Sequence, residues 1–143
     1  DPSPALAGHA PLTPAMRLVS QVGYVRRVPR GYAVSYGLRR PVERDTTVAT
    51  VPIGYADGVP RRLFDVGGEV LIGGRRRSLA GVVTMDQLLV DCGDDIIERG
   101  DEVVLIGAQG SERVGAEEWA ERLGTISYEI VCGISARVPR RYT

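Results

Sequence analysis

Glycine breaks the apolar segments of this chain at short intervals, which limits the folds open to it. The 143 residues include 18 glycines, about one in eight, against an average share of about 7%. In residues 70–77, VLIGGRRR, an apolar run enters a Gly-Gly pair. Both central residues of a two-residue hairpin turn need positive φ, and Gly73 and Gly74 adopt it without steric cost. Short strands bent at glycines favour a small barrel.

Hydrophobic periodicity predicts mostly strands. Segments rich in Val, Ile, Leu, Thr and Tyr predict strands at residues 18–28, 33–38, 46–53, 88–91 and 102–106. Residues 116–123 have apolar side chains at helical spacing, and Gly115 suits the N-cap and Gly124 the C′ position. Residues 126–135 alternate apolar and polar positions, which predicts a further strand.

Composition excludes several classes of protein. The net charge is zero and the pI is about 6.8, so no overall positive field would attract nucleic acid or anionic lipid. Apolar runs such as residues 103–106 are far shorter than the roughly 20 residues that cross a bilayer. The length fits one domain with its own core. We expect a domain at residues 15–143, preceded by a proline-rich linker or arm at residues 1–14 from another domain.

The reactive side chains are few. All 18 cationic residues are arginines, so any Schiff-base amine must come from elsewhere, because arginine cannot replace lysine in that role. Cys92, Cys132 and His9 do not form a zinc-binding pattern, and we expect no metal site. With no signal peptide, two reduced thiols and a cytoplasmic location are expected, although the sequence leaves the redox state of the two cysteines open.

Four clusters and a closing motif resemble the C-terminal domain of alanine racemase. They are VSYG at residues 34–37, PIGYADG at 52–58, MDQ at 85–87, GTISYE at 124–129 and RVPR at 137–140. The resemblance covers nearly the whole chain. It implies a mainly β fold, a small Greek-key-like β-barrel with one or two short helices near the C-terminal end, and it implies a helix around Tyr128.

The resemblance also implies a reaction that this chain cannot complete alone. Alanine racemases interconvert L-alanine and D-alanine, which supplies D-alanine for peptidoglycan. They are homodimers whose N-terminal (β/α)8 barrel binds pyridoxal 5′-phosphate through a Schiff-base lysine, and each active site lies between the barrel of one subunit and the C-terminal domain of the other. The lysine is absent from this chain, so we expect the fragment to be inactive without the barrel.

The family pattern assigns a role to six residues. Tyr36 is the expected catalytic base, a phenolate that removes the proton of L-alanine in the partner's site. The Met85 amide is expected to bind the substrate carboxylate, and Tyr128 to donate a hydrogen bond to the coenzyme phosphate. The entry corridor is expected to contain Tyr55, Asp86 and Arg61.

Other interpretations remain open from the sequence. Val82 stands where many members have arginine, and residues 38–40, Leu-Arg-Arg, replace the usual residues after Tyr-Gly. Tyr36 could be an ordinary aromatic residue packed against the core. The chain could also be a non-catalytic β-barrel module for subunit association, or one that binds oligonucleotides through arginines near Tyr24 and Tyr32, although zero net charge disfavours the latter.

Overall fold

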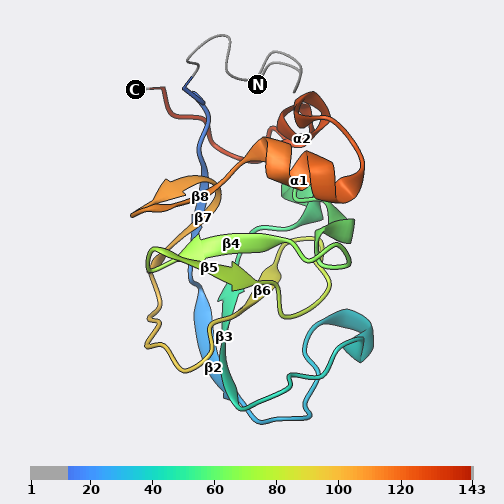
Figure 1. The fold of residues 1–143 in the computed structure, drawn as a ribbon, viewed down its shortest axis with the longest axis vertical. Helices are drawn as coiled ribbons and strands as arrows, with labels where there is room; N and C mark the ends of the chain where they lie inside the picture. The colour runs from blue at the N-terminus through green and yellow to red at the C-terminus, as the bar shows by residue number, and fades with distance from the viewer. Residues whose placement is uncertain (1–12, 143) are drawn as a thin grey trace.

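The computed structural model describes residues 13–142, so the expected arm, with His9, lies outside the described residues except for its last two positions. Within residues 13–142, eight strands and two helices follow one another (Figure 1). The strands are β1 (Leu18–Gln21), β2 (Tyr24–Val28), β3 (Thr46–Val51), β4 (Glu69–Ile72), β5 (Arg75–Ser78), β6 (Leu88–Asp91), β7 (Glu102–Gln109) and β8 (Glu112–Val114). The helices are α1 (Ala116–Leu123) and α2 (Ser127–Gly133), and three 3-10 turns are η2 (Tyr36–Leu38), η3 (Tyr55–Asp57) and η4 (Arg61–Leu63).

The strands form two antiparallel sheets instead of the single closed barrel expected from the sequence. One sheet has the order β1-β7-β4-β5, with β8 paired to β7, and the other has the order β2-β3-β6. The chain changes sheets at Val22 and Gly23, whose N–H groups donate to Asp101 and Thr50 respectively. Between β5 and β6, pairing is limited to one bridge, Leu79 with Val90. The sheets therefore pack on each other without a continuous hydrogen-bonded ladder around them.

The Gly-Gly hairpin and the first helix are confirmed. Gly73 and Gly74 have φ of 63° and 71° between the paired strands β4 and β5. α1 has the predicted bounds, and Gly124 ends it at φ 72° and ψ 38°. No helix of residues 13–142 is long and apolar enough to cross a membrane.

Two strand predictions are wrong. Residues 33–38 form a β-bridge only at Ala33, followed by η2, because Ser35, Gly37 and Leu38 have positive φ and cannot extend a strand. Residues 127–133 form α2, as the family resemblance implied. The period-two pattern misled because Ile130 and Ile134, which are both buried, are also four residues apart, a spacing that equally fits one face of a helix.

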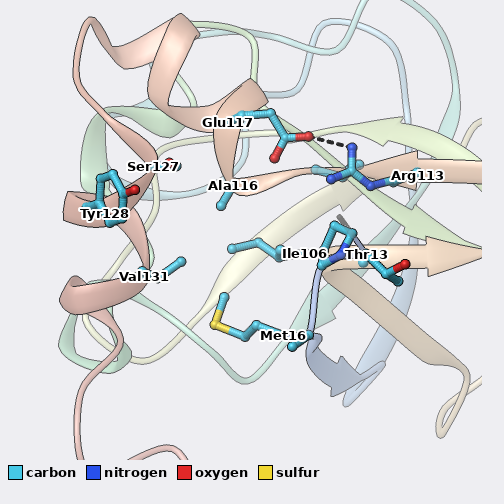
Figure 2. Close-up of a pocket in the computed structure, with 13 residues that line it drawn as sticks. Thr13, Met16, Ile106, Arg113, Ala116, Glu117, Ser127, Tyr128 and Val131 are labelled. Carbon is cyan, nitrogen blue, oxygen red and sulfur yellow. Dashed lines mark hydrogen bonds and ion pairs between the residues drawn. The ribbon is translucent and has the colours of Figure 1, made fainter. Parts of the chain in front are cut away.

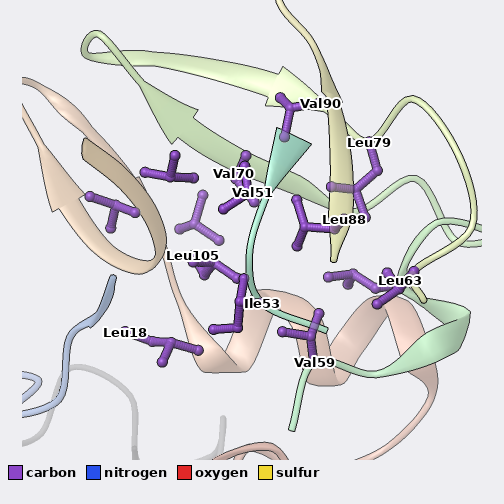
Figure 3. Close-up of a cluster of buried hydrophobic side chains, with 14 of the residues drawn as sticks. Leu18, Val51, Ile53, Val59, Leu63, Val70, Leu79, Leu88, Val90 and Leu105 are labelled. Atoms are coloured by element: carbon purple, nitrogen blue, oxygen red, sulfur yellow. The ribbon is translucent and has the colours of Figure 1, made fainter. Parts of the chain in front are cut away.

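Aliphatic side chains from both sheets fill the space between them, and α1 closes one end (Figures 1 and 3). Figure 3 shows Val51 and Leu88 of the smaller sheet beside Val70 and Leu105 of the larger one. Trp119 of α1 is completely buried in the same core. A second small cluster, Val28, Val42, Val48 and Ala80, lies under the segment that connects β2 to β3.

An ion-pair network centred on Arg76 attaches α1 to the larger sheet. The Arg76 guanidinium on β5 contacts Glu69 of β4 at 3.1 Å, Glu112 of β8 at 3.1 Å and Glu118 of α1 at 2.9 Å. Arg122 of α1 also contacts Glu69 and Glu118. The hydrogen bond from Arg76 holds the pKa of the Glu118 carboxyl below its usual range. Four elements thus meet at one half-buried guanidinium.

Acid should therefore weaken the attachment of α1. A carboxyl whose folded pKa lies below its unfolded value, about 4.3 for glutamate, stabilises the fold above that pH, and the contribution is lost as pH falls through the folded pKa. We expect Arg76→Gln to lower the free energy of unfolding at pH 7 by about 1–2 kcal/mol and to flatten its decline below about pH 4.5. Urea unfolding measured from pH 7 to pH 3 checks this. Arg26→Gln, on the exposed β2, is the control, and an unchanged pH profile in Arg76→Gln would contradict the interpretation.

Candidate functional site

Five of the six predicted site residues lie around one open hollow of about 850 Å³. Tyr36 comes from η2, Tyr55 and Arg61 from η3 and η4, and Met85 and Asp86 from the turn before β6. The rest of the lining is Ser35, Val82, Val83, Thr84, Gln87 and Leu89. Residues up to 54 positions apart in the chain therefore meet at one surface.

The backbone around Tyr36 directs its side chain outward. Ser35 has φ 67° and ψ −179°, and its hydroxyl donates to the Val82 carbonyl at 2.6 Å. A Cβ at Gly81 would lie 2.5 Å from the Ser35 Cβ, so this close approach requires glycine. Positive φ in non-glycine residues costs free energy and persists where surrounding contacts enforce it. Tyr36 is 80% exposed as a result, which rules out the alternative that it packs against the core.

Two arginines after Tyr36 fasten this segment to the turn after η4. Arg39 forms an ion pair with Asp65 at 3.0 Å. The Arg40 guanidinium lies over the ring of Phe64, 4.9 Å from its centroid, within the range of a cation–π contact. Arg39 and Arg40 thus attach the tyrosine segment to residues 64 and 65.

The turn at residues 54–57 packs directly on the backbone of the Met85 turn. The N–H groups of Tyr55 and Ala56 donate to the carbonyls of Thr84 and Met85 at 2.9 and 3.0 Å. A Cβ at Gly54 would lie 2.3 Å and 2.4 Å from those two oxygens. Only glycine fits there.

The Met85 turn leaves the N–H groups of Met85, Asp86 and Gln87 without a backbone acceptor among residues 13–142. Thr84 closes it, because its N–H and hydroxyl both donate to the Gln87 carbonyl. The Met85 N–H donates to no backbone carbonyl of residues 13–142, and the Met85 side chain is about half exposed. Val82 is buried at 2% exposure and brings no charge to the hollow.

Tyr128 lies elsewhere, in a second hollow of about 320 Å³ that shares no lining residue with the first. In Figure 2, Tyr128 lies on α2. Val131 and Met16 lie below it in this view, and the Arg113–Glu117 ion pair lies on the opposite side of the picture from Tyr128. The Tyr128 side chain is 59% exposed. The six predicted residues therefore form two separate surfaces.

Sequence reasoning missed the contact that Arg137 makes with Asp86, one of the residues that line the first hollow. Its guanidinium pairs with Asp57 at 3.2 Å and with Asp86 at 2.7 Å, and the hydrogen bond to Asp86 raises the Arg137 pKa. The RVPR motif places an arginine at residue 137, but contacts 51 and 80 residues away cannot be read from local pattern.

Neither cysteine belongs to these surfaces. Both are free, Cys132 is exposed, and burial raises the pKa of the Cys92 thiol to about 11. Within residues 13–142 no three His, Cys, Asp or Glu side chains gather as metal ligands would.

Comparison with known proteins decides the family. The family model described as "Alanine racemase, C-terminal domain" matches residues 15–142. The chain belongs to this family. It is 52% identical over 131 residues to the alanine racemase of Frankia casuarinae, which covers 92% of this chain and 34% of that protein. It is 51% identical over 142 residues to the alanine racemase of Symbiobacterium thermophilum, which covers 99% of this chain and 37% of that protein.

Solved structures give the same result. The alanine racemase of Bacillus anthracis with bound L-Ala-P superposes with a TM-score of 0.90 at 41% identity, over 96% of this chain and 36% of that one. The alanine racemase of E. faecalis superposes with a TM-score of 0.91 at 38% identity, over 98% of this chain and 37% of that one. The chain spans about a third of the length of the relatives it matches.

The close packing at Gly54 predicts that adding a single methyl group there destabilises the fold. Gly54→Ala should lower the free energy of unfolding by about 1–3 kcal/mol, because the new Cβ meets two backbone carbonyls that cannot move independently. Gly133→Ala is the matched control, since a Cβ at Gly133 meets nothing within 4 Å. Thermal unfolding of the two variants checks this, and equal midpoints would contradict the described packing.

Proposed function

We propose that this chain is the C-terminal domain of a pyridoxal-phosphate-dependent alanine racemase, and that it presents Tyr36 as a base to the active site of a partner subunit. The exposed phenol of Tyr36, beside the Met85 amide in an open hollow, carries the proposal. Family membership and 52% identity to an alanine racemase support it. The proposed reaction interconverts L-alanine and D-alanine in the cytoplasm and supplies D-alanine for peptidoglycan.

The reaction requires two bases, because racemisation removes the Cα proton on one face and returns a proton on the other. Pyridoxal 5′-phosphate, when bound, supplies the electron sink that makes this proton acidic. On this chain, the Tyr36 hydroxyl oxygen would accept or donate the proton on one face. The other base and the coenzyme lysine must come from a barrel domain, since the chain contains no lysine.

The Met85 turn fits the recognition of a carboxylate. A backbone N–H that has no carbonyl partner within the described residues, in a residue that lines an open hollow, can donate to an anionic oxygen. Arg61 at the rim makes no ion pair with residues 13–142 and would attract an amino acid by its carboxylate. Tyr55 and Asp86 would border the path by which the substrate enters.

The second hollow fits a different part of the coenzyme. The exposed Tyr128 hydroxyl can donate a hydrogen bond to a phosphate oxygen, and residues 13–16, which line the same hollow, lie at the N-terminal side of the described chain. We assign Tyr128 to the coenzyme of its own subunit's barrel, and Tyr36 to the coenzyme of the partner subunit. On this proposal the working enzyme is a homodimer, each site draws on both subunits, and the isolated domain is inactive.

The oligonucleotide alternative gains no support from the structure. Some of its arginines are paired with carboxylates: Arg27 with Asp94, Arg39 with Asp65, and Arg75 and Arg77 both with Asp95.

Removing the Tyr36 hydroxyl tests the proposal. In the full-length protein, Tyr36→Phe should lower L-to-D turnover at least about 100-fold, because a general base contributes that much or more. Coenzyme binding, followed by absorbance, should be retained. Tyr32→Phe, which changes another exposed tyrosine outside the hollow, is the control. Near-normal turnover in Tyr36→Phe would contradict the assignment.

A further inference from the structure

We propose that Arg137 is a positioning residue for substrate binding: its guanidinium fixes the Met85 turn so that the amide can receive the substrate carboxylate. This inference rests on the proposed function, since it concerns the carboxylate of the same substrate.

The arginine joins two turns through two carboxylates. Nε contacts Oδ1 of Asp57 at 3.2 Å, and Nη2 contacts Oδ1 of Asp86 at 2.7 Å. A planar guanidinium presents its donors in a fixed fork, so two such contacts set the relative position of both carboxylates. Lysine, a point charge on a flexible stem, could not do this equally well.

Asp57 is held firmly on one side of this link. Its side chain is only 13% exposed, its Oδ2 accepts the Gly54 N–H at 2.9 Å, and its carbonyl accepts the Ser135 N–H at 3.1 Å. A Cβ at Gly58 would lie 2.4 Å from the Gly133 carbonyl, which shows how closely this turn packs on the end of α2. Asp57 therefore provides a rigid attachment point.

Asp86 lies on the other side, at the exposed tip of the Met85 turn, with its side chain 55% exposed. It follows Met85 directly, so a restraint on Asp86 also restrains the peptide groups that flank Met85. Its one hydrogen-bond acceptor contact among residues 13–142 is with Arg137. Without the arginine, the tip would depend on the Thr84–Gln87 turn bonds and on the Ala56–Met85 hydrogen bond.

Arg137 also changes the charge at the hollow. Asp86 lines the hollow, and Asp57 belongs to η3, the turn that also contains the lining residue Tyr55. An unpaired carboxylate beside the amide would repel the anionic group of the substrate. Arg137 partly neutralises both acids, which favours carboxylate binding in addition to fixing the turn.

Within the RVPR motif, Arg140 stabilises the local fold and Arg137 contacts the site, so a variant can remove one role and keep the other. The Arg140 guanidinium donates to the carbonyls of Ile134, Ser135 and Val138 and thereby fixes the segment after α2. The Arg137 guanidinium contacts side chains of the site and no backbone carbonyl of residues 13–142. Its loss should therefore affect the site more than the fold.

The test measures steady-state kinetics of the full-length enzyme with L-alanine. For Arg137→Gln we expect KM to rise about three- to tenfold with kcat changed less than about twofold, because the amide contact serves ground state and transition state alike. Arg137→Lys should recover part of the loss. Arg141→Gln, at an exposed arginine four residues away, should match the wild type.

Two further measurements separate positioning from a general loss of structure. The inhibition constant of propionate, a simple carboxylate, should rise in parallel with KM in Arg137→Gln. In the double variant with Asp86→Asn, KM should be no higher than in Arg137→Gln alone, because both changes remove the same contact.

Three results would overturn the proposal: an unchanged KM in Arg137→Gln, a fall in kcat with KM unchanged, or an equal rise of KM in Arg141→Gln. A wild-type protein without racemase activity would instead refute the proposed function. The activity of the wild type, measured first, distinguishes the two failures.

Discussion

The close approach of Gly54 to the backbone of Thr84 and Met85 is the constraint on which the site depends. Two N–H groups of one turn donate to two carbonyls of the other at 2.9 and 3.0 Å, in a space that leaves no room for a side chain at residue 54. Gly81 makes a similar approach to Ser35. These glycines let three turns from distant parts of the chain meet, so that the exposed groups of Tyr36 and Met85 rest on a rigid base.

Much of the fold could be predicted where local chemistry decides it. The Gly73-Gly74 hairpin and α1 follow from turn chemistry and helical spacing, and the structure confirms both. Periodicity failed at residues 33–38, because the positive φ of Ser35 and Leu38 is enforced by tertiary contacts that the local sequence does not encode. Closure of the barrel also failed as a prediction, since the limited pairing between β5 and β6 depends on how both sheets pack.

The site could be anticipated only through the family motifs. Nothing in periodicity or composition brings Tyr36, Tyr55 and Met85 together, yet the structure places all three around one hollow. Arg137 belongs to the RVPR motif, but its partners Asp57 and Asp86 lie far along the chain, so only the three-dimensional structure shows these contacts. The contacts of Arg39 and Arg40, which fasten the tyrosine segment, could not be predicted from the sequence for the same reason.

The central claim is that this domain completes the active site of another subunit, and mixed dimers test it most directly. One full-length subunit would carry Tyr36→Phe, and the other a replacement of the coenzyme lysine in its barrel, so that neither variant is active alone. If the tyrosine acts in the partner's site, each mixed dimer regains one intact site of two and about half of the wild-type activity. Mixed dimers that stay inactive would contradict the claim, because tyrosine and lysine would then have to come from the same subunit.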